Sequence, residues 1–241
     1  MILAVISGAA LLFVATSIGA LLVLLFGCVD GRKQSVLLAF SAGVMSYAVY
    51  EMVVQAHTAG DAVAVGGFIA GFIILSLVER LLPHLHSSMT RGKGDAKRRA
   101  TLLAGTVTLH NVPEGLAVAA SFAASPALGW VTTAAIAVQD VPEGFVVSAP
   151  LACYGVKRVK AVALGVLSGA VEAAALLAGY AFLYTVAGVV PLALALSAGA
   201  MSFVVLVELL PQALVKGNER FGGAAFVLGV VIAFGLAVVI S

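Results

Sequence analysis

Eight long apolar segments, separated by short polar connections, make up most of the 241-residue chain. A helix of about 20 apolar residues crosses the hydrocarbon core of a bilayer, so each segment is long enough to span it. The chain is 62% hydrophobic and 10% charged, whereas soluble domains are roughly 45–50% apolar and about 25% charged. The sequence therefore predicts a polytopic membrane protein and excludes a soluble globular domain.

The predicted fold is all-α, with a single transmembrane domain over residues 1–241. Gly, Pro and polar residues between the apolar runs set the expected ends of the helices. The eight spans are expected at 3–26, 35–56, 63–83, 101–124, 128–153, 160–186, 190–213 and 222–240. The longest connection, at about 84–100, is expected to be a basic cytoplasmic loop.

The basic residues predict the orientation of the chain in the membrane. All 13 lysines and arginines lie in or at the connections that follow odd-numbered spans, and the alternate connections contain none. Cytoplasmic loops of membrane proteins are enriched in Lys and Arg. We therefore expect a multi-pass membrane protein with the basic connections in the cytoplasm and both termini outside.

Two pairs of related segments predict inverted-topology repeats. The segment at 41–47 in the second span resembles 197–203 in the seventh, and 110–115 in the fourth resembles 139–144 in the fifth. The members of each pair cross the membrane in opposite directions. In secondary transporters such repeats place the substrate site near the middle of the bilayer, so the fourth and fifth spans are the expected central pair.

Four acids fall near the middle of their predicted spans: Glu114, Asp140, Glu143 and Glu172. Each costs about 2.5–3.5 kcal/mol at the centre of a bilayer unless its charge is compensated, so such acids are interpreted as functional. No Lys or Arg lies at that depth. Protonation or bound cations would compensate the acids, and a proton relay without metal is the simpler alternative.

The neighbours of these acids favour cations. His110 and Glu114 are four residues apart and share a helix face, with Asn111 beside them, and Gln139 and Glu143 repeat the spacing in the next span. Four carboxylates match the charge of two divalent cations. A mixed imidazole and carboxylate set suits Zn²⁺, Fe²⁺ or Mn²⁺ better than Ca²⁺ or Mg²⁺. A glycine follows each glutamate and would allow a neighbouring helix to approach closely.

The motifs His-Asn-Val-Pro-Glu-Gly at 110–115 and Gln-Asp-Val-Pro-Glu-Gly at 139–144 resemble the signature of the ZIP family of divalent metal-ion transporters, in its bacterial GufA-type branch. The resemblance covers the whole chain. It implies a binuclear metal site with a first ion at His110, Glu114, Gln139 and Glu143, and with Met45 as a soft ligand. It implies a second ion at Asn111, Glu114, Asp140, Glu143 and Glu172.

The chain departs from the family pattern at three positions. Gln139 stands where many members have a second histidine, Ala173 where a proline is common, and Val207-Glu208 where a His-Glu pair is common. Glutamine is a neutral and weaker ligand than histidine. The departures therefore bear on metal preference and on the strength of single ligands.

Other polar residues have weaker claims. Glu51 and Glu208, near opposite ends of the path, are interpreted as entry and exit positions or as ordinary interfacial acids. His84 and His86 are interpreted as collecting released metal or as a solvated pair. Glu79 beside Arg80 is interpreted as a surface ion pair.

The predicted function is transport of divalent transition-metal ions into the cytoplasm, with Zn²⁺ as the first choice and Fe²⁺, Mn²⁺, Co²⁺ or Cd²⁺ as alternatives. Two other functions stay open: an intramembrane metal-dependent hydrolase, and a cation or proton channel that uses the same path. We expect no enzymatic activity and no organic cofactor. The expected partners are metal ions and the lipid bilayer, with no nucleic acid, and a homodimer stays open.

Overall fold

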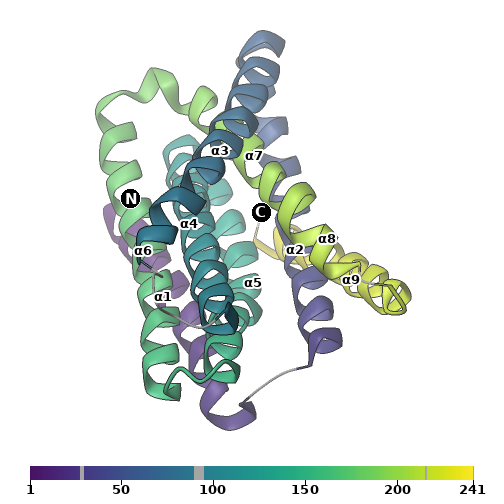
Figure 1. Ribbon diagram of the computed structural model, residues 1–241. Helices are drawn as coiled ribbons and strands as arrows, with labels where there is room; N and C mark the ends of the chain where they lie inside the picture. Colours follow the sequence, from purple (N-terminus) through teal and green to yellow (C-terminus); the bar gives the residue numbers. More distant parts are fainter. Residues whose placement is uncertain (28–29, 90–94, 215, 241) are drawn as a thin grey trace.

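The computed structural model describes residues 1–27, 30–89, 95–214 and 216–240 (Figure 1), apart from the side chains of 81–104, 106–109 and 187. These described residues form helices and no strand, which confirms the all-α prediction. Six helices are long and apolar enough to cross a membrane. The helices are α1 (Ile2–Phe26), α2 (Gly31–His57), α3 (Asp61–Met89), α4 (Asp95–Ala124), α5 (Pro126–Cys153), α6 (Arg158–Thr185), α7 (Val190–Phe203), α8 (Leu210–Ala213) and α9 (Glu219–Ile240), with the short elements η1 (Ala187–Val189) and η2 (Val204–Leu209) on either side of α7.

A helix lies over each predicted span, but the connection between the third and fourth spans differs from the prediction. Both helices continue into the segment that we expected as a loop at 84–100, because α3 ends at Met89 and α4 begins at Asp95. Hydropathy marks only the membrane-embedded part of a helix. Lys and Arg are good helix formers in water, so the basic start of α4 can stay helical outside the apolar run.

The seventh span contains a π-helix, η2, between α7 and α8. There the N–H of Leu210 donates to the carbonyl of Val205, five residues earlier. The side chain of Gln212 donates to the backbone carbonyl of Glu208 at 2.8 Å. Short π-helical turns are frequent at functional sites, and this one contains the acid Glu208.

The helices pack in two groups (Figure 1). In the first group α1, α4, α5 and α6 contact one another, and in the second α2 contacts α7 and α9 while α3 contacts α7. The groups meet where α2 contacts α5 and where α7 contacts α4. The motif-bearing helices α4 and α5 therefore lie against the second group.

Glycines of the repeated segments make equivalent contacts. A methyl group on Gly43 in α2 would overlap the backbone of Phe226 in α9, and one on Gly199 in α7 would overlap the backbone of Phe68 in α3. These two glycines hold the same position in the related segments at 41–47 and 197–203. Close backbone contact at small residues is a common way for membrane helices to associate. The α2–α9 contact thus corresponds to the α7–α3 contact, as inverted repeats require.

Gly199→Ala is expected to destabilise the bundle. The added methyl group would force the backbones of α7 and α3 apart, and overpacking typically costs about 1–3 kcal/mol. That cost corresponds to a fall of roughly 3–10 °C in the midpoint of thermal unfolding, measured in detergent. Gly235→Ala in α9 is the matched control, because a methyl group there meets nothing within 4 Å. Equal midpoints for the two variants would contradict the close contact.

Candidate metal centre

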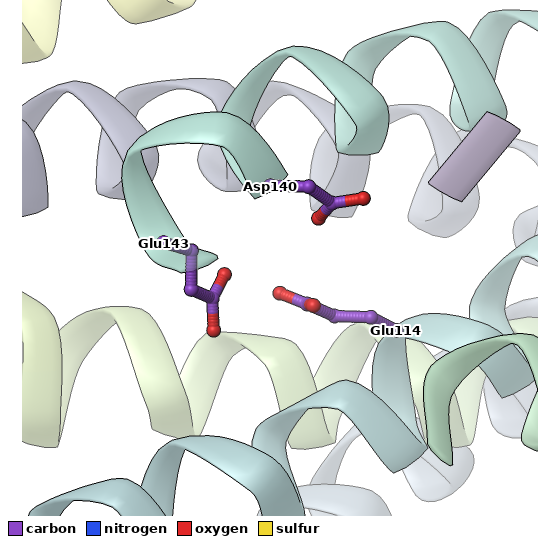
Figure 2. A group of neighbouring side chains, drawn as sticks. All are labelled: Glu114, Asp140 and Glu143. Carbon is purple, nitrogen blue, oxygen red and sulfur yellow. The ribbon is translucent and has the colours of Figure 1, made fainter. Parts of the chain in front are cut away.

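Three buried carboxylates converge between α4 and α5. Glu114 comes from α4, and Asp140 and Glu143 come from α5 (Figure 2). One carboxylate oxygen from each residue lies within 4.8 Å of the others. The exposed fractions of these residues are 0%, 1% and 8%, respectively. Three acids at this spacing and burial can share a cation, and they would repel one another without compensation.

The glycine after each glutamate fixes the helices around this group. A methyl group on Gly115 in α4 would overlap the carbonyl of Glu172 in α6. One on Gly144 in α5 would overlap the carbonyl of Thr16 in α1. The expected close approach after each glutamate is therefore confirmed. Because α6 is held against α4 at Glu172 itself, the fourth acid belongs to the same buried region.

Many oxygens in this region have no hydrogen-bond partner. Buried polar atoms are nearly always paired in native structures, so a cluster of unpaired oxygens indicates a ligand or water. Among the described side chains, the unpaired oxygens here are Asn111 Oδ1, Glu114 Oε2, Gln139 Oε1, both of Asp140 and both of Glu172. They form an all-oxygen donor set with several negative charges, which fits divalent cations.

The two amides of the motifs are oriented by hydrogen bonds. Gln139 Nε2 donates to Glu114 Oε1 at 2.6 Å, which joins α5 to α4. Asn111 Nδ2 donates to the carbonyl of Ser168 at 3.4 Å, which joins α4 to α6. In each case the amide nitrogen donates a hydrogen bond to another residue of the protein. The amide oxygen of each residue is therefore left for a ligand.

His110 contacts an acid of the seventh span rather than the Glu114 group. Its Nε2 atom lies 2.7 Å from Glu208 Oε2, and both side chains are at most 7% exposed. Glu143 interacts electrostatically with both members of this pair. Glu143 therefore connects the His110–Glu208 pair with the Glu114–Asp140 pair.

Two residues have contacts with the acids that the sequence analysis did not predict. Glu79 forms no ion pair with Arg80 among the described side chains, and its charge interacts instead with those of Glu208 and His110. The surface-pair interpretation was wrong because adjacent residues of a helix point in different directions. Thr16 in α1 lies beside Glu172, and nothing in its sequence context marked it.

The remaining candidate residues are not in the group of three carboxylates. Met45 is 1% exposed and packs in the apolar core. Glu51 in α2 accepts a hydrogen bond from the hydroxyl of Tyr47. The side chains of His84 and His86 lie outside the described residues.

Comparison with known proteins gives a consistent set of relatives. A family model described as "ZIP Zinc transporter" matches residues 93–241. The chain is 34% identical over 240 residues to the zinc transporter ZIPB of Bordetella bronchiseptica. The matched region covers 94% of this chain and 77% of that protein. It is 32% identical to the zinc transporter ZupT of Chlorobium chlorochromatii over 90% of each chain. It is 34% identical to the zinc transporter GufA of Myxococcus xanthus over 69% of this chain and 67% of that protein.

Proposed function

The chain belongs to the ZIP zinc transporter family, and we propose that it carries divalent transition-metal ions, Zn²⁺ first among them, across the inner membrane into the cytoplasm. The family membership predicted from the two motifs is thereby confirmed. The observation that carries the proposal is the set of unpaired buried oxygens around Glu114, Asp140 and Glu172. Metal ions are the substrate of this activity, and no catalytic residue is assigned.

The proposed site holds two ions that share Glu114 and Glu143. The first uses His110, Gln139 and the two glutamates, with Met45 from α2. The second uses Asn111, Asp140, Glu172 and the same glutamates. The 4.8 Å grouping of Glu114, Asp140 and Glu143 supports shared carboxylates. The unpaired amide oxygens of Asn111 and Gln139 support one neutral ligand for each ion.

The His110–Glu208 contact supports a direction of movement within the site. His110 Nε2 contacts Glu208 Oε2 in this conformation. The first ion must therefore displace the Glu208 carboxylate before it can bind to that nitrogen. The released carboxylate would then be the next acid available to the ion. Glu79 interacts electrostatically with Glu208 and would be the next acid for the ion after Glu208. Movement of one helix group against the other, as in transporters built from inverted repeats, would open the two ends in turn.

Uptake of Zn²⁺ into proteoliposomes tests the proposal. His110→Ala is expected to lower uptake at limiting Zn²⁺ by at least tenfold, since even the loss of an outer-shell partner costs a metal site about 10–100-fold in affinity. His57→Ala is the matched control, because His57 is exposed and pairs with Asp61 at the connection between α2 and α3.

The form of the uptake curve separates the alternatives. Saturable uptake that is impaired by His110→Ala alone is the expected result, with a comparison of Zn²⁺, Fe²⁺, Mn²⁺, Co²⁺ and Cd²⁺ giving the preference. Flux that rises linearly with concentration would favour a channel. Binding of metal without any flux would contradict transport, and cleavage of a substrate by the purified protein would favour a hydrolase.

A further inference from the structure

A cavity opens beside the end of α1 and the start of α2, and none of the acids of the metal centre lines it. Its volume is about 560 Å³, which is within the range of sites for small organic ligands. It lies between helices of the two groups, because α1 and α5 supply one wall and α2 the other. The lining residues are Leu22, Phe26, Arg32, Lys33, Val36, Leu37, Phe145 and Asn218.

The walls of this cavity are apolar. Phe26 at the end of α1 and Phe145 in α5 meet edge to face, with ring centroids 6.5 Å apart. Phe26 is 68% exposed although it ends an apolar helix. Leu22 lies one helical turn before Phe26, and Leu37 lies one turn after Lys33. An apolar slot therefore leads from the membrane-embedded part of the helices to the basic residues.

The mouth of the cavity carries positive charge. Arg32 forms no ion pair with any described residue. Lys33 lies 3.7 Å from Asp30, and the backbone N–H of Lys33 lowers the pKa of the Asp30 carboxyl. A methyl group on Gly27, at the end of α1, would lie 3.3 Å from the guanidinium of Arg158. The excess of positive charge disfavours a metal cation and favours an anion.

The start of α2 positions the two basic residues. Asp30 caps the helix, because its carboxylate accepts the backbone N–H of Lys33 at 2.8 Å, and α2 continues for 27 residues from Gly31. That carboxylate already occupies the positive end of the helix, so the anion preference of the cavity rests on the side chains of Arg32 and Lys33.

We propose that the cavity binds an anionic phospholipid of the cytoplasmic leaflet, with its phosphate at Arg32 and Lys33 and one acyl chain against Leu22, Phe26 and Phe145. An apolar slot that ends in basic side chains at a membrane surface matches such a lipid at both ends. The choice of leaflet rests on the predicted cytoplasmic placement of the basic connections.

The lipid would connect the two helix groups. Asn218, which also lines the cavity, donates hydrogen bonds to the carbonyl of Arg32 at 3.2 Å and to the hydroxyl of Ser35 at 2.6 Å. The start of α2 is thereby fixed to the connection between α8 and α9. A lipid held between Arg32 and Phe145 would join this unit to α1 and α5.

Native mass spectrometry of lipid retention tests the proposal independently of transport. The purified protein is incubated with equal amounts of phosphatidylglycerol and phosphatidylcholine, and the lipid that stays bound is measured. The wild type is expected to retain phosphatidylglycerol preferentially. Arg32→Gln/Lys33→Gln is expected to weaken this retention by about thirtyfold, which corresponds to about 1 kcal/mol for each basic side chain near the lipid.

Two further variants make the result decisive. Lys157→Gln/Lys160→Gln removes the same charge from another basic connection and is expected to keep retention within twofold. Leu22→Trp fills the apolar slot without a change of charge and is expected to lower retention. Equal losses in the two charge variants, no effect of Leu22→Trp, or equal retention of the two lipids by the wild type would each overturn the proposal. Displacement of the lipid by inorganic phosphate at constant ionic strength would indicate a site for a free anion and would also overturn it.

Discussion

Glu143→Gln is expected to weaken the binding of both zinc ions by about a thousandfold while it stabilises the metal-free protein. One carboxylate oxygen of Glu143 lies within 4.8 Å of a carboxylate oxygen of Glu114 and of Asp140. Glu143 also interacts electrostatically with His110 and Glu208. Loss of one unit charge about 4 Å from a cation costs about 4 kcal/mol at an effective dielectric constant of about 20, which is roughly a thousandfold in affinity. Both ions are affected because both are proposed to share this carboxylate.

The two effects of Glu143→Gln have opposite signs for a physical reason. In the metal-free protein Glu143 is one of several buried acids that repel one another, and its neutral isostere removes that repulsion together with the cost of burying a charge. The midpoint of thermal unfolding without metal should therefore rise. The further rise that Zn²⁺ causes in the wild type should be lost, since ligand binding stabilises a protein only as far as the ligand binds.

Equilibrium dialysis with Zn²⁺ and thermal unfolding with and without Zn²⁺ measure the two effects. Glu51→Gln is the matched control, because it makes the same change at an acid of α2 that accepts a hydrogen bond from Tyr47 and is not in the group of Glu114, Asp140 and Glu143. It is expected to leave affinity and the stabilisation by Zn²⁺ unchanged. A lower midpoint for metal-free Glu143→Gln, with unchanged binding of Zn²⁺, would mean that Glu143 has a structural role.

The fold could be predicted from the sequence to a large extent because the bilayer imposes simple rules. Apolar runs must be helices, because the backbone of a membrane-spanning segment has no water to bond with. The two Pro-Glu-Gly motifs then marked α4 and α5, and the glycines after Glu114 and Glu143 predicted helix contacts that the structure has. Such features depend on local sequence.

The contacts between distant helices could not be predicted in the same way. Glu208, the partner of His110, lies within the π-helix η2, where the wider turn changes the directions in which side chains point. Hydrophobic periodicity over a few turns does not reveal one wide turn. The proximity of Glu79 to this pair depends in turn on how α3 crosses the bundle. Interhelical geometry, rather than composition, determines both contacts.

Glu172→Ala is expected to remove one of the two zinc ions and to leave the other in place. Glu172 is fully buried in α6, and Thr16 and Asn111 lie beside its carboxylate. It is not part of the group formed by Glu114, Asp140 and Glu143 within 4.8 Å. It can therefore serve the second ion, on the Asn111 side, without contact to the first ion on the His110 side.

The number of zinc ions bound at saturation distinguishes this arrangement from a single shared site. Wild-type protein is expected to bind two ions, and Glu172→Ala one ion with an affinity close to that of the tighter wild-type site. Glu172→Gln is the matched variant, since it keeps the side-chain volume and removes only the charge. It should also bind one ion, with the second weakened by roughly a thousandfold for the loss of one unit charge. If Glu172→Gln abolished all binding, the two-ion assignment would be wrong, because a residue that contacts one ion only cannot remove both.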